Sequence, residues 1–195
     1  MSSLRNTVFR AITGLKQADV SGSPDGDVKG MLLSVGGASS RTKSGIDLSR
    51  AAQALGVSRR TVERWVRTAD TGRGQRPSAE HAKALAAKAR QAASTKAGRR
   101  QLVKRLGMVE KVTAQGVTVT IAGEQGPRNR DYMRPRTVQR DVYGEDAAQM
   151  VQAWQDGGEK GFVAWATEFW GNDYVPEWRF ETIEAVDIEI PGDSR

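Results

Sequence analysis

An arginine-rich segment, residues 123–140, contains the side chains whose types best suit chemistry on a phosphate. Tyr132 lies here between Asp131 and Arg134, with Thr118, Thr120 and Thr137 nearby. A hydroxyl can attack a phosphorus atom when cations hold the phosphate oxygens and a carboxylate takes up the proton. The pattern therefore indicates either a nucleophilic hydroxyl or, more simply, a loop that binds nucleic acid.

Composition excludes most other catalytic chemistry. The sequence has no cysteine, so it has no disulfide, thiol nucleophile or thiolate metal site, which is typical of a reducing cytoplasm. Its one histidine, His81, leaves no zinc cluster and no Ser-His-Asp set, and we expect it at the surface. Neither a P-loop nor a dinucleotide-binding glycine pattern occurs. The acidic residues near the end can in principle bind Mg²⁺, but a solvated strand face or a docking surface is the simpler interpretation. They are Glu181, Glu184, Asp187 and Glu189.

Charge is divided unevenly along the 195 residues. The net charge of +7 is the sum of +17 over residues 1–140 (27 basic, 10 acidic) and −10 over residues 141–195 (3 basic, 13 acidic). This division predicts a nucleic-acid-binding protein with a separate C-terminal module. No segment has the length and apolar character of a signal peptide or a membrane span, so we expect a cytoplasmic, nucleoid-associated protein.

Residues 48–67 fit a helix-turn-helix. Ala52 is small where two helices cross closely, and Gly56 suits a tight turn with a left-handed backbone. Ser58 is a favourable N-cap for the second helix. Apolar residues at helical spacing supply the seam between the helices, namely Leu48, Ala51, Leu55, Val57, Val62, Trp65 and Val66.

The predicted recognition helix turns a basic face outward. Arginine forks can hold phosphates or read guanine, and Glu63 can accept from cytosine or orient an arginine. Flexible loops and the following basic helix add predicted phosphate contacts. The predicted DNA-binding residues are Ser58, Arg59, Arg60, Thr61, Glu63, Arg64, Arg67, Arg41, Lys43, Arg73, Arg76, Arg99 and Arg100.

The elements that position these residues form an α+β protein. The N-terminal part is mostly helical, with helices over about 2–20, 48–68 and 78–106. Alternation over 108–113 and 117–121 predicts a hairpin, followed by a polar loop over 123–136. Two helices, over 144–156 and 159–170, precede a last strand within 180–190 that joins the small sheet. We predict three parts: 1–30, an N-terminal helix and linker; 31–107, the DNA-binding domain; and 108–195, an acidic-ended α+β domain. Trp154, Trp165 and Trp170 are expected in a core or interface rather than stacked on bases.

Several segments, in the same order over roughly residues 45–190, resemble the telomere-protecting terminal proteins of linear actinomycete replicons. The similar segments are Ala-Ala-Gln-Ala-Leu-Gly-Val-Ser-Arg-Arg-Thr-Val-Glu-Arg-Trp-Val (51–66), Arg-Pro (76–77), Lys-Ala-Arg-Gln-Ala-Ala (88–93), Asp-Ala-Ala-Gln-Met-Val-Gln-Ala-Trp-Gln-Asp-Gly-Gly (146–158) and Ile-Glu-Ala-Val-Asp-Ile-Glu-Ile (183–190).

The resemblance implies a protein that caps the ends of linear replicons and becomes covalently joined to the 5′ end of DNA. In that family a threonine hydroxyl primes a DNA polymerase, which supplies Mg²⁺, and a telomere-binding protein recruits the complex. Such a primer is a substrate rather than an enzyme and needs no cofactor of its own. This sequence has no threonine at the matching place, so the candidate linking hydroxyls are, in order, Tyr132, Thr120, Thr118 and Thr137.

Two other functions stay open. A helix-turn-helix transcriptional regulator or plasmid-maintenance protein would use the acidic end for homodimerisation or effector binding. A nuclease or recombinase would use the C-terminal carboxylates. Palindromic operator binding favours the regulator, whereas binding to terminal or hairpin DNA favours the terminal protein.

Overall fold

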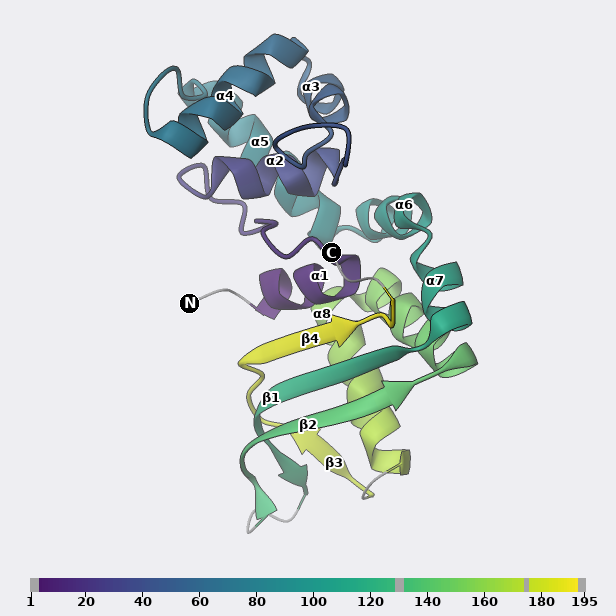
Figure 1. Ribbon diagram of the computed structural model, residues 1–195. Coiled ribbons are helices and arrows are strands. Elements are labelled where there is room, and N and C mark those ends of the chain that lie inside the picture. The colour runs from purple at the N-terminus through teal and green to yellow at the C-terminus, as the bar shows by residue number, and fades with distance from the viewer. Residues whose placement is uncertain (1–3, 129–131, 174–175, 193–195) are drawn as a thin grey trace. The chain divides into compact units, whose positions relative to one another are not determined.

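The computed structural model describes residues 4–128, 132–173 and 176–192, and over these residues the chain is an α+β protein (Figure 1). The elements are α1 (Leu4–Thr13), α2 (Val28–Gly36), α3 (Leu48–Leu55), α4 (Arg59–Thr71), α5 (Ala79–Ser94), α6 (Lys96–Leu106), α7 (Met108–Gln115), β1 (Val117–Pro127), β2 (Arg134–Val142), α8 (Gly144–Asp173), β3 (Trp178–Phe180) and β4 (Ala185–Glu189). Among the described residues, no helix is both long enough and apolar enough for a membrane crossing.

The chain divides into two compact units. One is Leu15–Gly98, and the other combines Met1–Gly14 with Arg99–Arg195. We call them the helical unit and the sheet unit. The domain boundaries predicted from the sequence, after residues 30 and 107, differ from the boundaries of these two units. The helical unit has fifteen Lys and Arg against seven Asp and Glu, a net charge of +8, and the sheet unit has fifteen against sixteen, a net charge of −1.

The helical unit is organised around one hydrophobic cluster. Met31 and Leu32 of α2 are completely buried and belong to the same cluster as Trp65 of α4 and Leu85 of α5. The side chain of Asp27 caps the start of α2 by accepting from the backbone N–H of Lys29. Gly36 ends this helix where an added Cβ would lie 2.5 Å from the carbonyl oxygen of Asp47, so a larger residue cannot fit there.

The sheet unit is built on β1, the central strand. β2 pairs antiparallel along one edge of β1, while β4 and then β3 pair along its other edge. The alternating side chains of Val117, Val119 and Ile121 are buried, and Figure 1 shows α8 running across one face of the sheet. The last strand therefore joins the hairpin's sheet as the sequence pattern predicted.

The predicted strand over 108–113 is wrong, because residues Met108–Gln115 form α7. Met108 and Val112 are four residues apart, so they share one helical face, and both are buried. A short run of alternating residues fits either period, and here burial on the helix prevails. The hairpin partner of β1 is β2, so most of the predicted polar loop over 123–136 lies in strands.

A long helix with one kink supplies much of the sheet unit's core. α8 bends at Gly158 (φ 64°, ψ −144°), which matches the predicted break between two helices. Trp154, Trp165 and Trp170 are all buried, so they pack in the core as expected. Glycine suits position 158 because its left-handed φ is unfavourable for residues with a Cβ.

Arg99 holds the kink. The kink leaves backbone carbonyls at the end of the first helical half without helical partners. The Nε of Arg99 donates to the carbonyl oxygen of Gln155 at 2.9 Å, and its Nη2 donates to that of Asp156 at 3.1 Å. Burial lowers the pKa of Arg99 from its usual value, while Glu159 and Asp156 partly offset this effect.

Glu159 completes this charged network. Its carboxylate accepts from Nη2 of Arg5 at 3.1 Å. Burial acts to raise the pKa of Glu159, but a backbone hydrogen bond and Arg5 outweigh it, so the pKa lies below the usual value. Because the folded pKa is lowered, this carboxylate stabilises the unit above the ordinary glutamate pKa. That contribution is lost as the pH falls through the lowered value.

We expect Arg99→Met to destabilise the sheet unit by about 2–4 kcal/mol, because it removes the donor to the buried carbonyl of Gln155 and to the partly buried carbonyl of Asp156. The neighbouring Arg100→Met is the matched control. Arg100 pairs with Asp156 at 3.2 Å, but its side chain is 54% exposed, so its loss costs under about 1 kcal/mol. Urea unfolding followed by tryptophan fluorescence measures both, since four of the five tryptophans lie in this unit. Equal effects of the two substitutions would contradict the role of Arg99.

Candidate nucleic-acid interface

A glycine turn joins the two helices of the helix-turn-helix. α3 begins after Asp47, whose side chain accepts from the backbone N–H of Arg50 at 3.0 Å. α3 ends at Gly56, which has a left-handed backbone (φ 65°, ψ 28°) and whose N–H donates to the carbonyls of Ala52 and Gln53. An added Cβ at Gly56 would meet nothing within 4 Å. Backbone conformation, not lack of space, therefore selects glycine here.

The second helix starts where the sequence predicted. Ser58 is in extended conformation and its Oγ accepts from the backbone N–H of Thr61 at 3.1 Å. α4 then runs from Arg59 to Thr71 and ends at Gly72, another left-handed glycine. Both ends of α4 are thus satisfied by local groups, which fixes the helix independently of any ligand.

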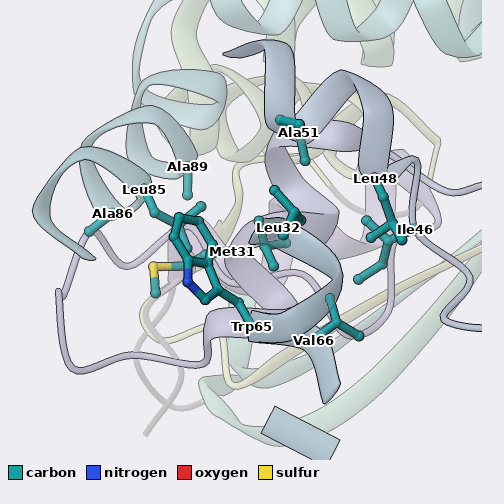
Figure 2. Close-up of a cluster of buried hydrophobic side chains, with 12 residues drawn as sticks. Met31, Leu32, Ile46, Leu48, Ala51, Trp65, Val66, Leu85, Ala86 and Ala89 are labelled. Atoms are coloured by element: carbon teal, nitrogen blue, oxygen red, sulfur yellow. The ribbon is translucent and has the colours of Figure 1, made fainter. Parts of the chain in front are cut away.

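Packing against the rest of the helical unit decides which face of α4 is free. Val62, Trp65 and Val66 are buried, and Ala52 of α3 is only 4% exposed. Figure 2 shows Trp65 and Val66 pointing into the cluster of side chains from the surrounding helices. The ring of His81 lies 5.5 Å from that of Trp65 and its Nδ1 is 2.7 Å from Oγ of Ser78, so His81 is half-buried rather than fully exposed.

The opposite face of α4 is basic and open to solvent. Its four arginines are exposed, whereas Thr61 and Glu63 are half-buried. Nε of Arg59 donates to Oε1 of Glu63 at 2.9 Å. Four guanidinium groups within nine residues of one helix make a surface suited to phosphates and guanine edges. They are Arg59, Arg60, Arg64 and Arg67.

Two loops of the same unit add exposed cations. Arg41 and Lys43 lie in a loop closed by a bridge between Ala38 and Ile46, and Oγ1 of Thr42 donates to the carbonyl of Ile46 at 2.8 Å. Arg73 and Arg76 follow α4. Their segment stays close to the end of α4, because the backbone N–H of Arg73 donates to Oγ1 of Thr71 at 3.3 Å and the carbonyl oxygen of Gln75 lies 3.1 Å from Oγ1 of Thr68.

Arg99 and Arg100 belong to the sheet unit, not to the unit that contains the helix-turn-helix. Arg99 is only 5% exposed and its guanidinium holds the carbonyls at the α8 kink. The prediction that Arg99 contacts DNA is therefore corrected, since a buried guanidinium cannot reach a phosphate. The sequence around Arg99 is rich in Lys and Arg, so it does not indicate that this side chain is buried against the kink of α8, 56 residues later.

The three candidate threonines share one face of the sheet. In antiparallel pairs, directly opposite residues point to the same side. Thr118 is opposite Asp141 of β2 and Glu189 of β4, and its Oγ1 donates to Oδ1 of Asp141 at 2.7 Å. Thr120 is opposite Gln139 and Asp187, while Thr137 is opposite Ala122. This polar face has exposed carboxylates at Asp141, Asp187 and Glu189.

The strand arginines of the hairpin lie on the other side. Arg134, Arg136 and Arg140 are opposite Gln125, Gly123 and Val119, the buried positions of β1. The register thus separates the threonine hydroxyls from the three arginines of β2. Sequence proximity alone could not show this separation.

Tyr132 has a different environment. Its side chain is 59% exposed. Its backbone carbonyl accepts from Nη2 of Arg136 at 2.5 Å, and the Arg136 guanidinium lies 5.5 Å from the centre of the buried Trp178 ring. An added Cβ at Gly126 would lie 2.5 Å from that same carbonyl, so glycine permits this close approach. Arg130 and Asp131, its predicted neighbours, lie outside the described residues.

The sequence does not indicate the contact between the Arg136 guanidinium and the Trp178 ring, because the two residues are 42 positions apart. Among the residues that the structure describes, no group of three or more His, Cys, Asp or Glu side chains lies together to hold a metal ion.

No protein-family model, curated protein or solved structure matches this chain.

Proposed function

We propose that this protein binds duplex DNA through its helix-turn-helix and serves as a terminal protein at the ends of a linear replicon. The observation that supports DNA binding best is the exposed arginine face of α4. Burial of Val62 and Trp65 fixes that face outward, and Ser58 and Gly72 fix the ends of the helix. A helix held in this way can enter the major groove without reorganising.

Electrostatics supports the same proposal. The helical unit has a net charge of +8, and its cations flank α4 in two loops as well as on the helix. Neutralising phosphates with such side chains releases counterions and makes affinity fall steeply with salt. The loop cations Arg41, Lys43, Arg73 and Arg76 then hold the DNA backbone while α4 addresses the bases.

Priming is the second part of the proposal, with Tyr132 as the linking residue. The Oη of Tyr132 attacks the α-phosphorus of an incoming deoxynucleoside triphosphate, a P–O bond forms, pyrophosphate leaves and the hydroxyl proton passes to a base. The polymerase supplies the Mg²⁺ for this step. Exposure of the phenol and fixation of its backbone by Arg136 favour Tyr132, whereas the carboxylates around Thr118 and Thr120 repel a phosphate.

The partners of the proposed protein are a DNA polymerase and a telomere-binding recruiter. The sheet face with Asp141, Asp187 and Glu189 suits a basic surface on one of them. The helix-turn-helix itself is also compatible with a DNA-bound homodimer. In the cell, this function places the protein with the nucleoid.

We expect replacement of Arg60, Arg64 and Arg67 by alanine, singly and together, to weaken duplex binding. Each phosphate contact removed reduces the slope of log K against log salt by about 0.9. Fluorescence anisotropy with a labelled duplex at several salt concentrations measures this slope. Lys160→Ala, a loss of one exposed cation from the sheet unit, is the charge-matched control and leaves the slope unchanged. Slopes that respond equally to both kinds of substitution would argue against the α4 interface.

We expect Tyr132→Phe to abolish nucleotidylation, because it removes only the hydroxyl. The assay incubates the full chain with its replicon's polymerase, Mg²⁺ and labelled nucleotide, and mass spectrometry then locates the label. Thr118→Ala, Thr120→Ala and Thr137→Ala are matched controls that keep their labelling. Undiminished labelling of Tyr132→Phe would exclude Tyr132, and absence of label on the unaltered chain would favour a regulator.

A further inference from the structure

One ion pair distinguishes the recognition helix. Arg59 is the first residue of α4 and Glu63 lies one turn later, with 2.9 Å between Nε of Arg59 and Oε1 of Glu63. The side chains are 57% and 42% exposed, so both are accessible to a partner. A cation at a helix N-terminus opposes the helix dipole, so Arg59 contributes little to the stability of α4 apart from its i,i+4 pair with Glu63.

The hydrogen bond orients the guanidinium. Arginine has five N–H donors in one plane, and Glu63 uses only the Nε donor. The two terminal amino groups make no hydrogen bond among the described residues, and the edge that they form together lies on the far side of Cζ from the bound Nε. A planar pair of free donors is what the O6 and N7 acceptors of guanine require in the major groove.

The other three arginines of α4 differ from Arg59 in their ion pairing. Within the described residues, Arg60, Arg64 and Arg67 form no ion pair with a carboxylate. Their side chains can follow the DNA backbone by changing rotamer, which suits phosphate contacts. Among the described residues, Arg59 is the one arginine of α4 with a carboxylate partner that favours one direction of its guanidinium before DNA binds. It also lies at the N-terminal end of α4, the end that contacts base edges in helix-turn-helix proteins.

We propose that Arg59 reads a guanine and that Glu63 is the positioning residue that makes this reading specific. This inference rests on the proposed duplex binding and deepens it, since it assigns one base-reading residue among several cations. Removing the Glu63 carboxylate frees the Arg59 side chain to rotate, so Arg59 retains its charge and loses its direction. Affinity for DNA in general is therefore kept, while preference for guanine at one position is lost.

The test is selection of duplexes from a randomised pool by the full chain, followed by sequencing and by affinity measurement on the selected duplex and its single-base variants. For the unaltered chain we expect guanine at one position to be preferred about tenfold or more over the other bases. Arg59→Ala abolishes that preference. Glu63→Ala reduces it several-fold at the same position, with unchanged or slightly higher affinity for unselected DNA and an unchanged unfolding temperature.

Two comparisons separate positioning from other roles of Glu63. Glu80→Ala removes one exposed carboxylate from α5 of the same unit and leaves the base preference intact. In the Arg59→Ala background, Glu63→Ala has no further effect on that position, because the two residues act as one unit. A changed preference at a different, cytosine position would mean that Glu63 reads a base directly, and this result overturns the proposal.

The remaining outcomes are also distinct. If Glu63→Ala leaves every base preference unchanged, the positioning role of Glu63 is overturned, but the proposed duplex binding is not. Binding of duplexes without any enrichment overturns base reading by Arg59. Failure of the unaltered chain to bind any duplex at low salt overturns the proposed function itself.

Discussion

The burial of Trp65 and Val62 on one side of α4 decides where every arginine of that helix points. These side chains are 3% and 0% exposed and belong to the cluster formed with α2, α3 and α5. Rotating α4 to hide its arginines would expose the indole of Trp65 and bury charge, and both changes cost free energy. The basic face is therefore a consequence of the core, and the caps at Ser58 and Gly72 preserve it without a ligand.

The helix-turn-helix could be predicted from sequence because its signals are local. Ala52, Gly56 and Ser58 each meet a requirement that is fixed by neighbours within a few residues. The strand over 108–113 could not be decided in that way. Six alternating residues are compatible with both a strand and a helix, and only tertiary burial of Met108 and Val112 selects α7.

Long-range geometry limited the prediction of the site. In the sequence, Arg99 resembles the other basic residues of its helix. In the structure its guanidinium donates to the backbone carbonyls of Gln155 and Asp156. The threonines near Tyr132 in sequence are separated from its arginines by strand register, which no composition argument supplies. The distribution of charge along the sequence predicted a separate acidic C-terminal module. In the structure the acidic residues of β4 and the arginines of β2 belong to one unit, and the net charge of that unit is −1.

We propose that the helical unit contacts duplex DNA through α4. NMR signals of the backbone amides, measured on the isotope-labelled full chain during titration with a duplex at moderate salt, show directly which residues contact DNA. We expect the largest shifts over residues 58–67, with smaller shifts in the loops that contain Arg41, Lys43, Arg73 and Arg76. Shifts confined to the sheet unit, with the signals of α4 unchanged at saturating DNA, would contradict it.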